Sequence, residues 1–476
     1  MDMNDIQFSA PEYQQDQSLW DVQYRYRGSV DKGWKIERDG ATWLELGPGY
    51  VPVKSLYCGI CSTDLARHLL PFPLPQIIGH ELVGEYHGEV VAVEINASHA
   101  ARGITDHDCE YCHCGLDSHC PDRLTLGIDR LPGGFSPWVL APVHAIHKLP
   151  ETVSPQAGVL IEPFAAAIKA VEVSPPSPGD RVAVLGPRRL GMLIIAALDS
   201  HRKLHHKQFE LIAVMRHEGL KNTAQALGAD KVILIRSNEH EDIHKQFDIV
   251  FDTTGSPTGF ELAVAMAKQT VHLKSTHGQA VMGLENLTSM VINEQTVTGY
   301  SEQKLLQLMA TNFGNSTNKN IYVSPSLLQN DYISRFDTTC ELVSHIDDAM
   351  FRQDPPQQFD FALVSSIEEL NQLMRPITTQ GQSLLKASGT VLLAPETGYL
   401  EKSTLINEIS QGQLQIVTSR CGSFAKTMDV LRQLPGLAEK LQKHLVTQTM
   451  DLGQLAEAMS LAGQSDKSIK VVVKTS

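Results

Sequence analysis

The chain contains two regions with different hydrophobic patterns. Residues 1 to about 150 hold short apolar runs, such as 50–53, 82–86 and 90–95, that alternate with Gly- and Pro-containing turns. Short runs bounded by turn residues are typical of β-strands. After the Pro-rich segment 175–180, apolar strands alternate with helical stretches instead. That alternation predicts an α/β fold with a parallel, doubly wound sheet.

Part of the second pattern occurs twice. A strand, a second strand and an Ile-Asn-Glu triplet are found at 247–251, 271–275 and 292–294, and again at 359–363, 390–394 and 406–408. The offset is 112 residues at the start and 114 at the end. We interpret this echo as a divergent internal duplication, or as an inserted segment that re-enters the sheet pattern. Chance similarity between two generic β-α-β units is the alternative.

Composition and charge restrict the class of protein. A length of 476 residues predicts two or three domains, and 42% hydrophobic with 20% charged residues is ordinary for a soluble globular protein. The formal net charge of −14 argues against a nucleic-acid partner or an anionic membrane. The first 17 residues are polar and acidic, unlike a signal peptide, and no run of eighteen apolar residues occurs. We therefore expect a cytoplasmic protein with neither nucleic acid nor membrane as partner.

Cysteine usage indicates metal binding. Six of the eight cysteines lie between positions 58 and 120. In a large chain without an export signal, clustered cysteines are more often metal ligands than disulfides. The first pair belongs to Cys-Gly-Ile-Cys-Ser-Thr-Asp at 58–64, and Gly-His-Glu follows at 79–81. We expect Cys58 to be a packing residue.

The two motifs combine the ligands of a catalytic zinc site. Cys61 and His80 supply a thiolate and an imidazole, Glu81 is adjacent, and Glu162 is a further anionic candidate. Such a site keeps one coordination position open for water or substrate. The Thr63 hydroxyl could carry a proton away from that position. A buried cysteine and a histidine satisfied within a turn are the structural alternative.

These motifs resemble the zinc-containing medium-chain alcohol dehydrogenase family, over about residues 40–295 and 405–476. Ile-Glu-Pro at 161–163 resembles its polyol, sugar and threonine dehydrogenase branch. The resemblance implies a catalytic zinc on Cys61, His80, Glu81 and Glu162, with Thr63 starting the proton relay. It also implies hydride transfer between an alcohol and a nicotinamide cofactor, in a homo-oligomer that is a dimer or tetramer.

The resemblance also implies a domain organisation. Residues 1–172 and 420–476 are expected to form a GroES-like, β-rich catalytic domain. Residues 173–419 are expected to form a Rossmann domain, with the inserted or duplicated α/β segment at about 299–403. The insert is the largest departure from the family pattern, and a catalytically inactive binding or assembly module on the same fold is the alternative function.

The second cysteine cluster departs from the family pattern. Relatives with a structural zinc commonly have four cysteines here, whereas this chain reads Asp106-x2-Cys109-x2-Cys112-x7-Cys120. A carboxylate can bind zinc, so Asp106 with the three thiolates forms a possible structural site. Cys114 could replace Asp106 if the loop folds differently, and an empty lobe with free thiols is the other possibility.

A dinucleotide-binding turn is expected after the strand 181–185. The pattern Gly-x-Gly-x-x-Gly is represented by Gly186-Pro-Arg188-Arg-Leu190-Gly191, in which Arg188 replaces the second glycine. An arginine there either displaces the pyrophosphate or binds it with its own charge. A degenerate turn that binds nothing is the alternative.

The next strand favours NADP over NAD. An NAD-selective site places Asp or Glu near the end of this strand, but the chain has Met215 followed by Arg216. Arg216 could bind a 2′-phosphate, or it could be a solvated surface charge. In relatives the loop that contains Gly255 passes near the nicotinamide ribose, so Gly255 is a further cofactor-binding candidate.

Overall fold

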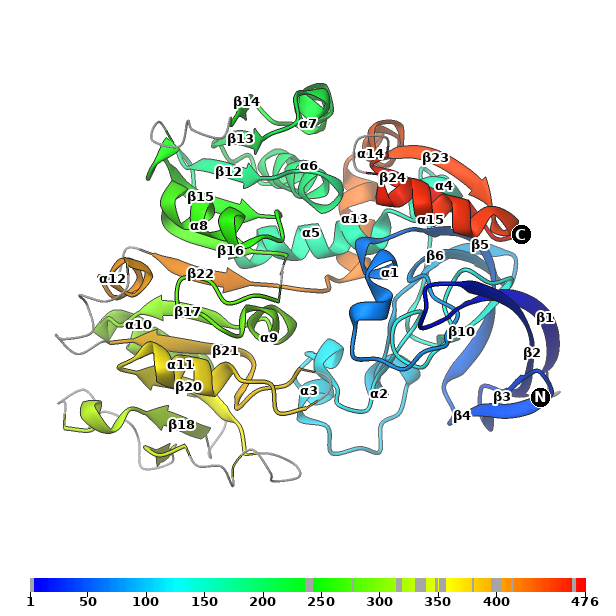
Figure 1. The fold of residues 1–476 in the computed structure, drawn as a ribbon, viewed down its shortest axis with the longest axis horizontal. Helices are drawn as coiled ribbons and strands as arrows, with labels where there is room; N and C mark the ends of the chain where they lie inside the picture. Colours follow the sequence, from blue (N-terminus) through cyan, green and yellow to red (C-terminus); the bar gives the residue numbers. More distant parts are fainter. Residues whose placement is uncertain are drawn as a thin grey trace. The chain divides into compact units, whose positions relative to one another are not determined.

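The chain folds into two compact units. The computed structural model describes residues 4–235, 243–275, 278–313, 319–329, 340–346, 350, 357–378, 381–394, 404–411, 414–464 and 468–476. The first unit contains residues 1–166 and 421–476, and the second contains residues 167–420 (Figure 1). The second unit is therefore inserted into the sequence of the first.

The first unit is built mainly from antiparallel strands. One sheet has the order β1-β2-β3-β4, and a larger one has the order β11-β7-β6-β5-β24-β23 with β10 also paired to β5. The pair β8-β9 forms a third, two-stranded sheet. The strands are β1 Asn4–Tyr13, β2 Leu19–Ser29, β3 Gly33–Arg38, β4 Ala41–Leu46, β5 Tyr50–Gly59, β6 Glu81–Tyr86, β7 Glu89–Val93, β8 Asn96–Ala97, β9 Leu124–Thr125, β10 Trp138–Pro142, β11 Ile146–Lys148, β23 Val446–Asp451 and β24 Lys470–Lys474.

Short helices connect these strands. They are α1 Ser62–Leu65, α2 His99–Arg102, α3 Glu110–His113, α4 Pro155–Gly158, α13 Phe424–Gln433, α14 Leu437–Leu445 and α15 Leu455–Gly463. Alternation explains why the strands form: in β2, Val22, Tyr24 and Tyr26 are buried while Asp21 and Gln23 are exposed. Residues two apart point to the same face of a strand, so one face enters the core. Helix α5 (Ile161–Val173) crosses the boundary between the units.

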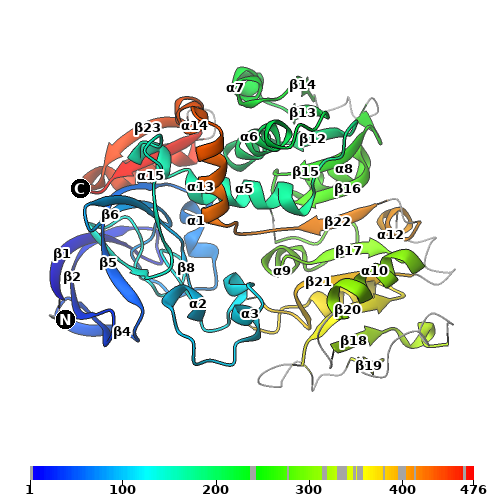
Figure 2. The ribbon, with the colours of Figure 1, turned by 180° about the vertical axis from the view of Figure 1, so that it is seen from behind.

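The second unit contains a single sheet of eleven strands. Its order is β14-β13-β12-β15-β16-β22-β17-β21-β20-β18-β19, and the succession can be followed from both sides (Figures 1 and 2). Neighbouring strands are parallel at every junction except β22-β17, which is antiparallel. The predicted parallel sheet is thus confirmed, but as two parallel halves that run in opposite directions. The strands are β12 Arg181–Leu185, β13 Glu210–Met215, β14 Lys231–Leu234, β15 Phe247–Asp252, β16 Ala267–Leu273, β17 Thr296–Gly299, β18 Lys319–Val323, β19 Cys340–Val343, β20 Phe359–Val364, β21 Leu385–Leu393 and β22 Gln415–Thr418.

Helices cover both faces of the sheet. They are α6 Arg189–Leu204, α7 Lys221–Leu227, α8 Pro257–Met266, α9 Leu287–Ile292, α10 Glu302–Phe313, α11 Ile367–Met374 and α12 Thr404–Ser410. Side chains of α8, α9, α11 and α12 belong to one hydrophobic core, whereas Leu305 of α10 belongs to a separate one. In β20, Ala362 and Val364 enter the first core and Phe361 and Leu363 the second. Because side chains alternate along a strand, the two cores lie on opposite faces.

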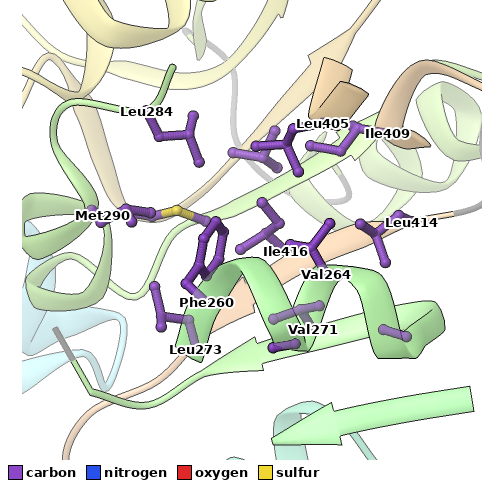
Figure 3. Close-up of a cluster of buried hydrophobic side chains, with 14 of the residues drawn as sticks. Phe260, Val264, Val271, Leu273, Leu284, Met290, Leu405, Ile409, Leu414 and Ile416 are labelled. Carbon is purple, nitrogen blue, oxygen red and sulfur yellow. The ribbon is translucent and has the colours of Figure 1, made fainter. Parts of the chain in front are cut away.

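The larger core continues across the antiparallel junction. Figure 3 shows Phe260 of α8 and Leu273 of β16 close to Met290 of α9 and Ile416 of β22. Leu405 of α12 belongs to the same cluster. The two halves of the sheet therefore share one continuous apolar layer. Among the described residues, no helix is long and apolar enough to span a membrane.

A buried carboxylate lies at the end of β15. Asp252 Oδ1 accepts hydrogen bonds from the Thr254 amide (2.9 Å) and hydroxyl (2.7 Å). Oδ2 has no hydrogen-bond partner within the described part of the chain. Burial raises the pKa of Asp252 to about 6, because it outweighs the two hydrogen bonds from Thr254.

Asp252→Asn should change how stability depends on pH. Since the pKa of Asp252 is raised on folding, its contribution favours the folded state below the unfolded value of 3.8 and is lost as the pH rises through about 6. Relative to the parent protein, the variant should gain up to about 3 kcal/mol between pH 4 and pH 7.5. Thermal unfolding of both proteins across this range measures the difference. A constant offset in Tm would contradict a raised pKa.

Candidate metal centres and cofactor site

The first metal motif is held in place by one aspartate. Cys61 precedes α1 as its N-cap, and its amide donates to Asp64 Oδ2 at 2.8 Å. The Gly79 amide donates to Asp64 Oδ1 at 3.2 Å. A single buried carboxylate therefore connects the segment that carries Cys61 with the segment that carries His80.

Cys61, His80 and Glu81 form a group of potential metal ligands. One ligand atom from each lies within 4.8 Å of the others. The Thr63 hydroxyl oxygen lies 3.7 Å from Cys61 Sγ, beside this group. A thiolate, an imidazole and a carboxylate are ligands that zinc accepts, and three protein ligands leave one position open. The donor set therefore fits a catalytic zinc ion.

Asp64 also controls the charge of His80. His80 Nδ1 lies 3.2 Å from Asp64 Oδ1, a close ion-pair distance without the geometry of a hydrogen bond. Burial, the largest single effect, lowers the pKa of His80, but Asp64 and Cys61 together outweigh it and raise this pKa well above its usual value. A raised pKa favours the protonated imidazole, with which a metal ion would have to compete.

Glu81 is already paired with a buried lysine. Lys470 Nζ donates to both carboxylate oxygens of Glu81, at 2.6 and 2.7 Å, and to the Ile60 carbonyl at 3.1 Å. Glu81 is fully buried and Lys470 is 3% exposed. Glu81 can therefore bind a metal only while it shares its charge with Lys470. The ammonium also fixes the backbone immediately before Cys61.

Two residues considered in the sequence analysis, Glu162 and Cys58, lie outside the group of Cys61, His80 and Glu81. Glu162, in the first turn of α5, is not among the ligand atoms that the structure brings together. Cys58 is fully buried in a hydrophobic cluster with Ile60 and Phe135. Burial raises the pKa of the Cys58 thiol well above its usual value, as expected for a neutral packing residue.

A second group of ligands forms in the cysteine-rich lobe. Ligand atoms of His99, Cys109, Cys112 and Cys120 all lie within 4.8 Å of one another. His99 Nδ1 is 3.4 Å from Cys120 Sγ and 4.0 Å from Cys112 Sγ. Burial raises the pKa of Cys120 to about 12 in the absence of a metal. Four ligands with no open position fit a structural zinc ion, which would ionise these thiols.

The histidine corrects the expected ligand set. Asp106 is exposed and lies outside the group, and His99 provides the fourth donor in its place. The pairing of β8 with β9 explains the change, because it joins Ala97 to Leu124 and so brings the start of α2 near Cys120. Cys114 is also exposed and outside the group.

The glycine turn lies at the carboxyl end of β12. Gly186 has a φ of +68°, and a Cβ atom there would lie 2.7 Å from Thr254 Cγ2. A Cβ atom on Gly191 would lie 2.6 Å from Thr253 Oγ1. Both glycines are therefore required by backbone shape and close packing, as in a dinucleotide-binding turn.

The other cofactor candidates follow adjacent strands. Arg188 is the N-cap residue of α6, and Leu190 lies in the first turn of that helix. Arg216 is exposed directly after β13, and Gly255 lies in the loop after β15 with a φ of +61°. Since β13, β12 and β15 are parallel neighbours, these residues share one edge of the sheet. Dinucleotides bind at the carboxyl ends of such strands.

Comparison with known proteins agrees with this chemistry. Residues 47–151 match the alcohol dehydrogenase GroES-like domain. The chain is 29% identical over 289 residues to (R,R)-butanediol dehydrogenase of Bacillus subtilis (strain 168), covering 53% of this chain and 77% of that protein. It is 26% identical over 267 residues to sorbitol dehydrogenase of the same strain, covering 51% and 70%. The chain is therefore similar to zinc-containing medium-chain alcohol dehydrogenases, and its residues 47–151 match their GroES-like domain.

A solved structure supports the fold of this chain. L-idonate 5-dehydrogenase from Escherichia coli matches with a TM-score of 0.56 at 13% identity, over the whole of both chains. The expected fold class, a GroES-like part with a Rossmann part, is thereby confirmed. Both groups of potential metal ligands lie within the GroES-like match.

Sequence reasoning missed two residues of the candidate metal centres. Lys470 is 389 positions from Glu81, and a lysine that begins an apolar strand carries no local signal of its partner. His99 lies ten residues before the first cysteine of the lobe. Its signal was its residue type, since histidine is a commoner zinc ligand than aspartate in closed sites with three thiolates.

Replacement of His99 should remove the structural zinc. We expect His99→Ala to lower the zinc content by one ion per chain, because only three donors would remain. Asp106→Ala is the matched control and should keep the parent content. Native mass spectrometry counts the ions directly. The opposite result, with loss in Asp106→Ala and retention in His99→Ala, would restore the original ligand set.

Proposed function

We propose that the protein is a zinc-dependent dehydrogenase that transfers a hydride between an alcohol and NADP, with NAD as the second choice. The observation that carries the proposal is the group formed by Cys61, His80 and Glu81, with the Thr63 hydroxyl 3.7 Å from Cys61 Sγ. The substrate class is a polyol, sugar or amino alcohol. The relatives named butanediol, sorbitol and threonine dehydrogenase support that class.

The ligand side chains have distinct roles in this mechanism. When bound, zinc supplies a Lewis acid that makes an alcohol hydroxyl easier to ionise or a carbonyl easier to reduce. Cys61 and His80 would hold the ion, and Asp64 would keep the His80 ring in orientation. Lys470 would limit the negative charge of Glu81, so that the site stays electrophilic. Glu162 remains a candidate ligand at the open side.

Thr63 would conduct the proton of the substrate. Its hydroxyl lies beside the sulfur ligand and can both accept and donate a hydrogen bond. In alcohol oxidation the hydroxyl would accept the substrate proton and release its own toward solvent. The nicotinamide, when bound, supplies the hydride acceptor. The remaining cofactor contacts would come from Gly186, Arg188 and Gly191 at the phosphates.

Loss of a zinc ligand should abolish turnover. Cys61→Ser and His80→Ala should each lower kcat/KM by more than about 100-fold, because the ion would be lost or displaced. Cys114→Ser, which changes an exposed thiol outside both ligand groups, should retain activity. A panel of polyols, sugars and amino alcohols with both cofactors provides the assay. If no panel member is turned over and NADPH does not bind, the binding or assembly module replaces this proposal.

Arg216 should determine cofactor choice. Arg216→Ala would remove a charge-assisted contact to the 2′-phosphate, so we expect KM for NADPH to rise by about 10- to 100-fold. KM for NADH should stay within about twofold, since NADH lacks that phosphate. Steady-state kinetics with both cofactors separates these effects. An equal change in both values would mean that Arg216 does not read the phosphate.

A further inference from the structure

The two halves of the eleven-stranded sheet follow the same strand plan. The first half has the order β14-β13-β12-β15-β16-β22, and the second, taken from the other end, has the order β19-β18-β20-β21-β17. β12 and β18, the first strand of each half in sequence, each pair with the next strand of the chain on one side and with a later strand on the other. β14 has no counterpart among the described residues of the second half. The first order is that of a dinucleotide-binding fold.

Residue contacts repeat along with the strand plan. The Asp248 carboxylate accepts from the Arg181 amide at 2.8 Å, and the Asp360 carboxylate accepts from the Asn320 amide at 2.9 Å. Lys268 lies 3.7 Å from Asp248, and Lys386 lies 3.2 Å from Asp360. These contacts make β12 equivalent to β18 and β15 equivalent to β20.

The register irregularities also repeat. The pairing of β15 with β16 shifts between Phe247 and Ile249, and that of β20 with β21 shifts between Phe359 and Phe361. The caps of the next helices agree as well, since Ser256 and Ser366 each accept the amide three residues on. Two unrelated β-α-β units would not need to share such details.

The junction between the halves has two-fold symmetry in its register. Val297 of β17 and Ile416 of β22 occupy equivalent positions, because each pairs in parallel with the same point of its neighbour. They also pair with each other across the antiparallel junction. A local two-fold axis therefore passes through the Val297–Ile416 pair.

The chain exchanges strands across this axis. β17 follows β16 in sequence but pairs with β21, and β22 follows β21 but pairs with β16. Each half is thus completed by a strand that comes after the other half. By this register Asn407 is not the counterpart of Asn293, because Asn407 lies within α12 whereas Asn293 follows α9. The predicted equivalence of the two Ile-Asn-Glu triplets is therefore wrong.

We propose that the segment from about residue 300 to residue 411 is a second copy of the nucleotide-binding half that acts as a built-in partner subunit. A half sheet that ended at β22 would expose the backbone groups of that strand, and an open edge recruits another chain. Here β17 covers β22, and the shared core of Figure 3 continues beneath both. The strand edge through which two separate copies of such a half could pair is therefore already covered by a strand of the same chain.

The second copy has lost the phosphate-binding turn. The strand register places Pro325 at the position of Gly186. Proline fixes φ near −65°, whereas Gly186 has a φ of +68°. A 3-10 turn, Pro325–Leu327, begins there instead of a glycine turn.

Side chains occupy the place of a phosphate in the second copy. The hydroxyl oxygen of Ser324 lies 2.7 Å from that of Ser365, and both residues are buried. The Ser365 amide donates to Glu369 Oε2 at 2.9 Å, while the Tyr322 hydroxyl donates to Glu369 Oε1 at 2.9 Å. A carboxylate that holds this amide would repel a pyrophosphate. Among the residues that the structure describes, only the first copy therefore keeps a cofactor site, a conclusion that rests on the proposed function.

The closed junction can be tested by a cross-strand disulfide. In the double variant Val297→Cys/Ile416→Cys, oxidation should join the two positions within one chain, so the protein should stay monomeric on a non-reducing gel. Peptide mass spectrometry should identify the 297–416 link, and Val297→Cys alone controls for native thiols. A covalent dimer through this link would overturn the proposal, as would the absence of any link in folded protein whose two new thiols react with a reagent.

Cofactor stoichiometry tests the lost turn separately. Calorimetric titration of the full chain with NADPH should give one site per chain. Gly186→Ala should weaken binding by at least about 10-fold, and Pro325→Ala should leave it unchanged. Two sites per chain, or a loss caused by Pro325→Ala, would contradict a non-binding second copy. Absence of both NADPH and NADH binding in the parent protein would refute the proposed function, while the disulfide result would still decide the pairing of the halves.

Discussion

The buried pair of Glu81 and Lys470 is the contact on which the catalytic unit depends. It joins β6 to β24, two strands separated by the entire second unit, and it fixes the Ile60 carbonyl next to Cys61. Removal of either partner alone would leave an uncompensated buried charge, at a cost of about 3–5 kcal/mol. The candidate metal group therefore receives its buried counter-ion from the C-terminal segment of the first unit. A local sequence motif is in this case completed by a very distant residue.

The predictability of each feature follows from the range of its interactions. The candidate ligands Cys61 and His80 and the glycines of the turn could be named from sequence, because each belongs to a short motif with a recognisable pattern. His99 could not, since its approach to Cys120 depends on the pairing of β8 with β9. The mismatch between the two Ile-Asn-Glu triplets could not be predicted either. The same asparagine follows a helix in the first copy and lies within a helix in the second. Strand register, which is set by long-range pairing, corrected both.

The antiparallel junction explains how the second unit accommodates eleven strands. Parallel sheets are covered by helices on both faces, and each added strand needs a crossover of suitable hand. With a two-fold axis through Val297 and Ile416, the sheet consists of two similar parallel halves and not of one longer parallel sheet. The strand exchange also makes the halves interdependent, since one of the two neighbours of β16 is β22, which follows the second half in the sequence. The insert that interrupts the family pattern is thus an integral part of the sheet.

Packing and ligand binding impose separate constraints on the two copies. β15 and β20 have the same pattern of buried and half-buried positions, because both must fill a sheet with apolar layers on its two faces. The turns after β12 and β18 differ, because Gly186 has a φ of +68° and Pro325, at the same position of the second copy, cannot adopt that conformation. Arg188 strengthens that contrast, because the same register places Leu327, an apolar residue, at its position in the second copy. A duplicated fold can in this way keep its core while only one copy keeps the chemistry at the strand ends.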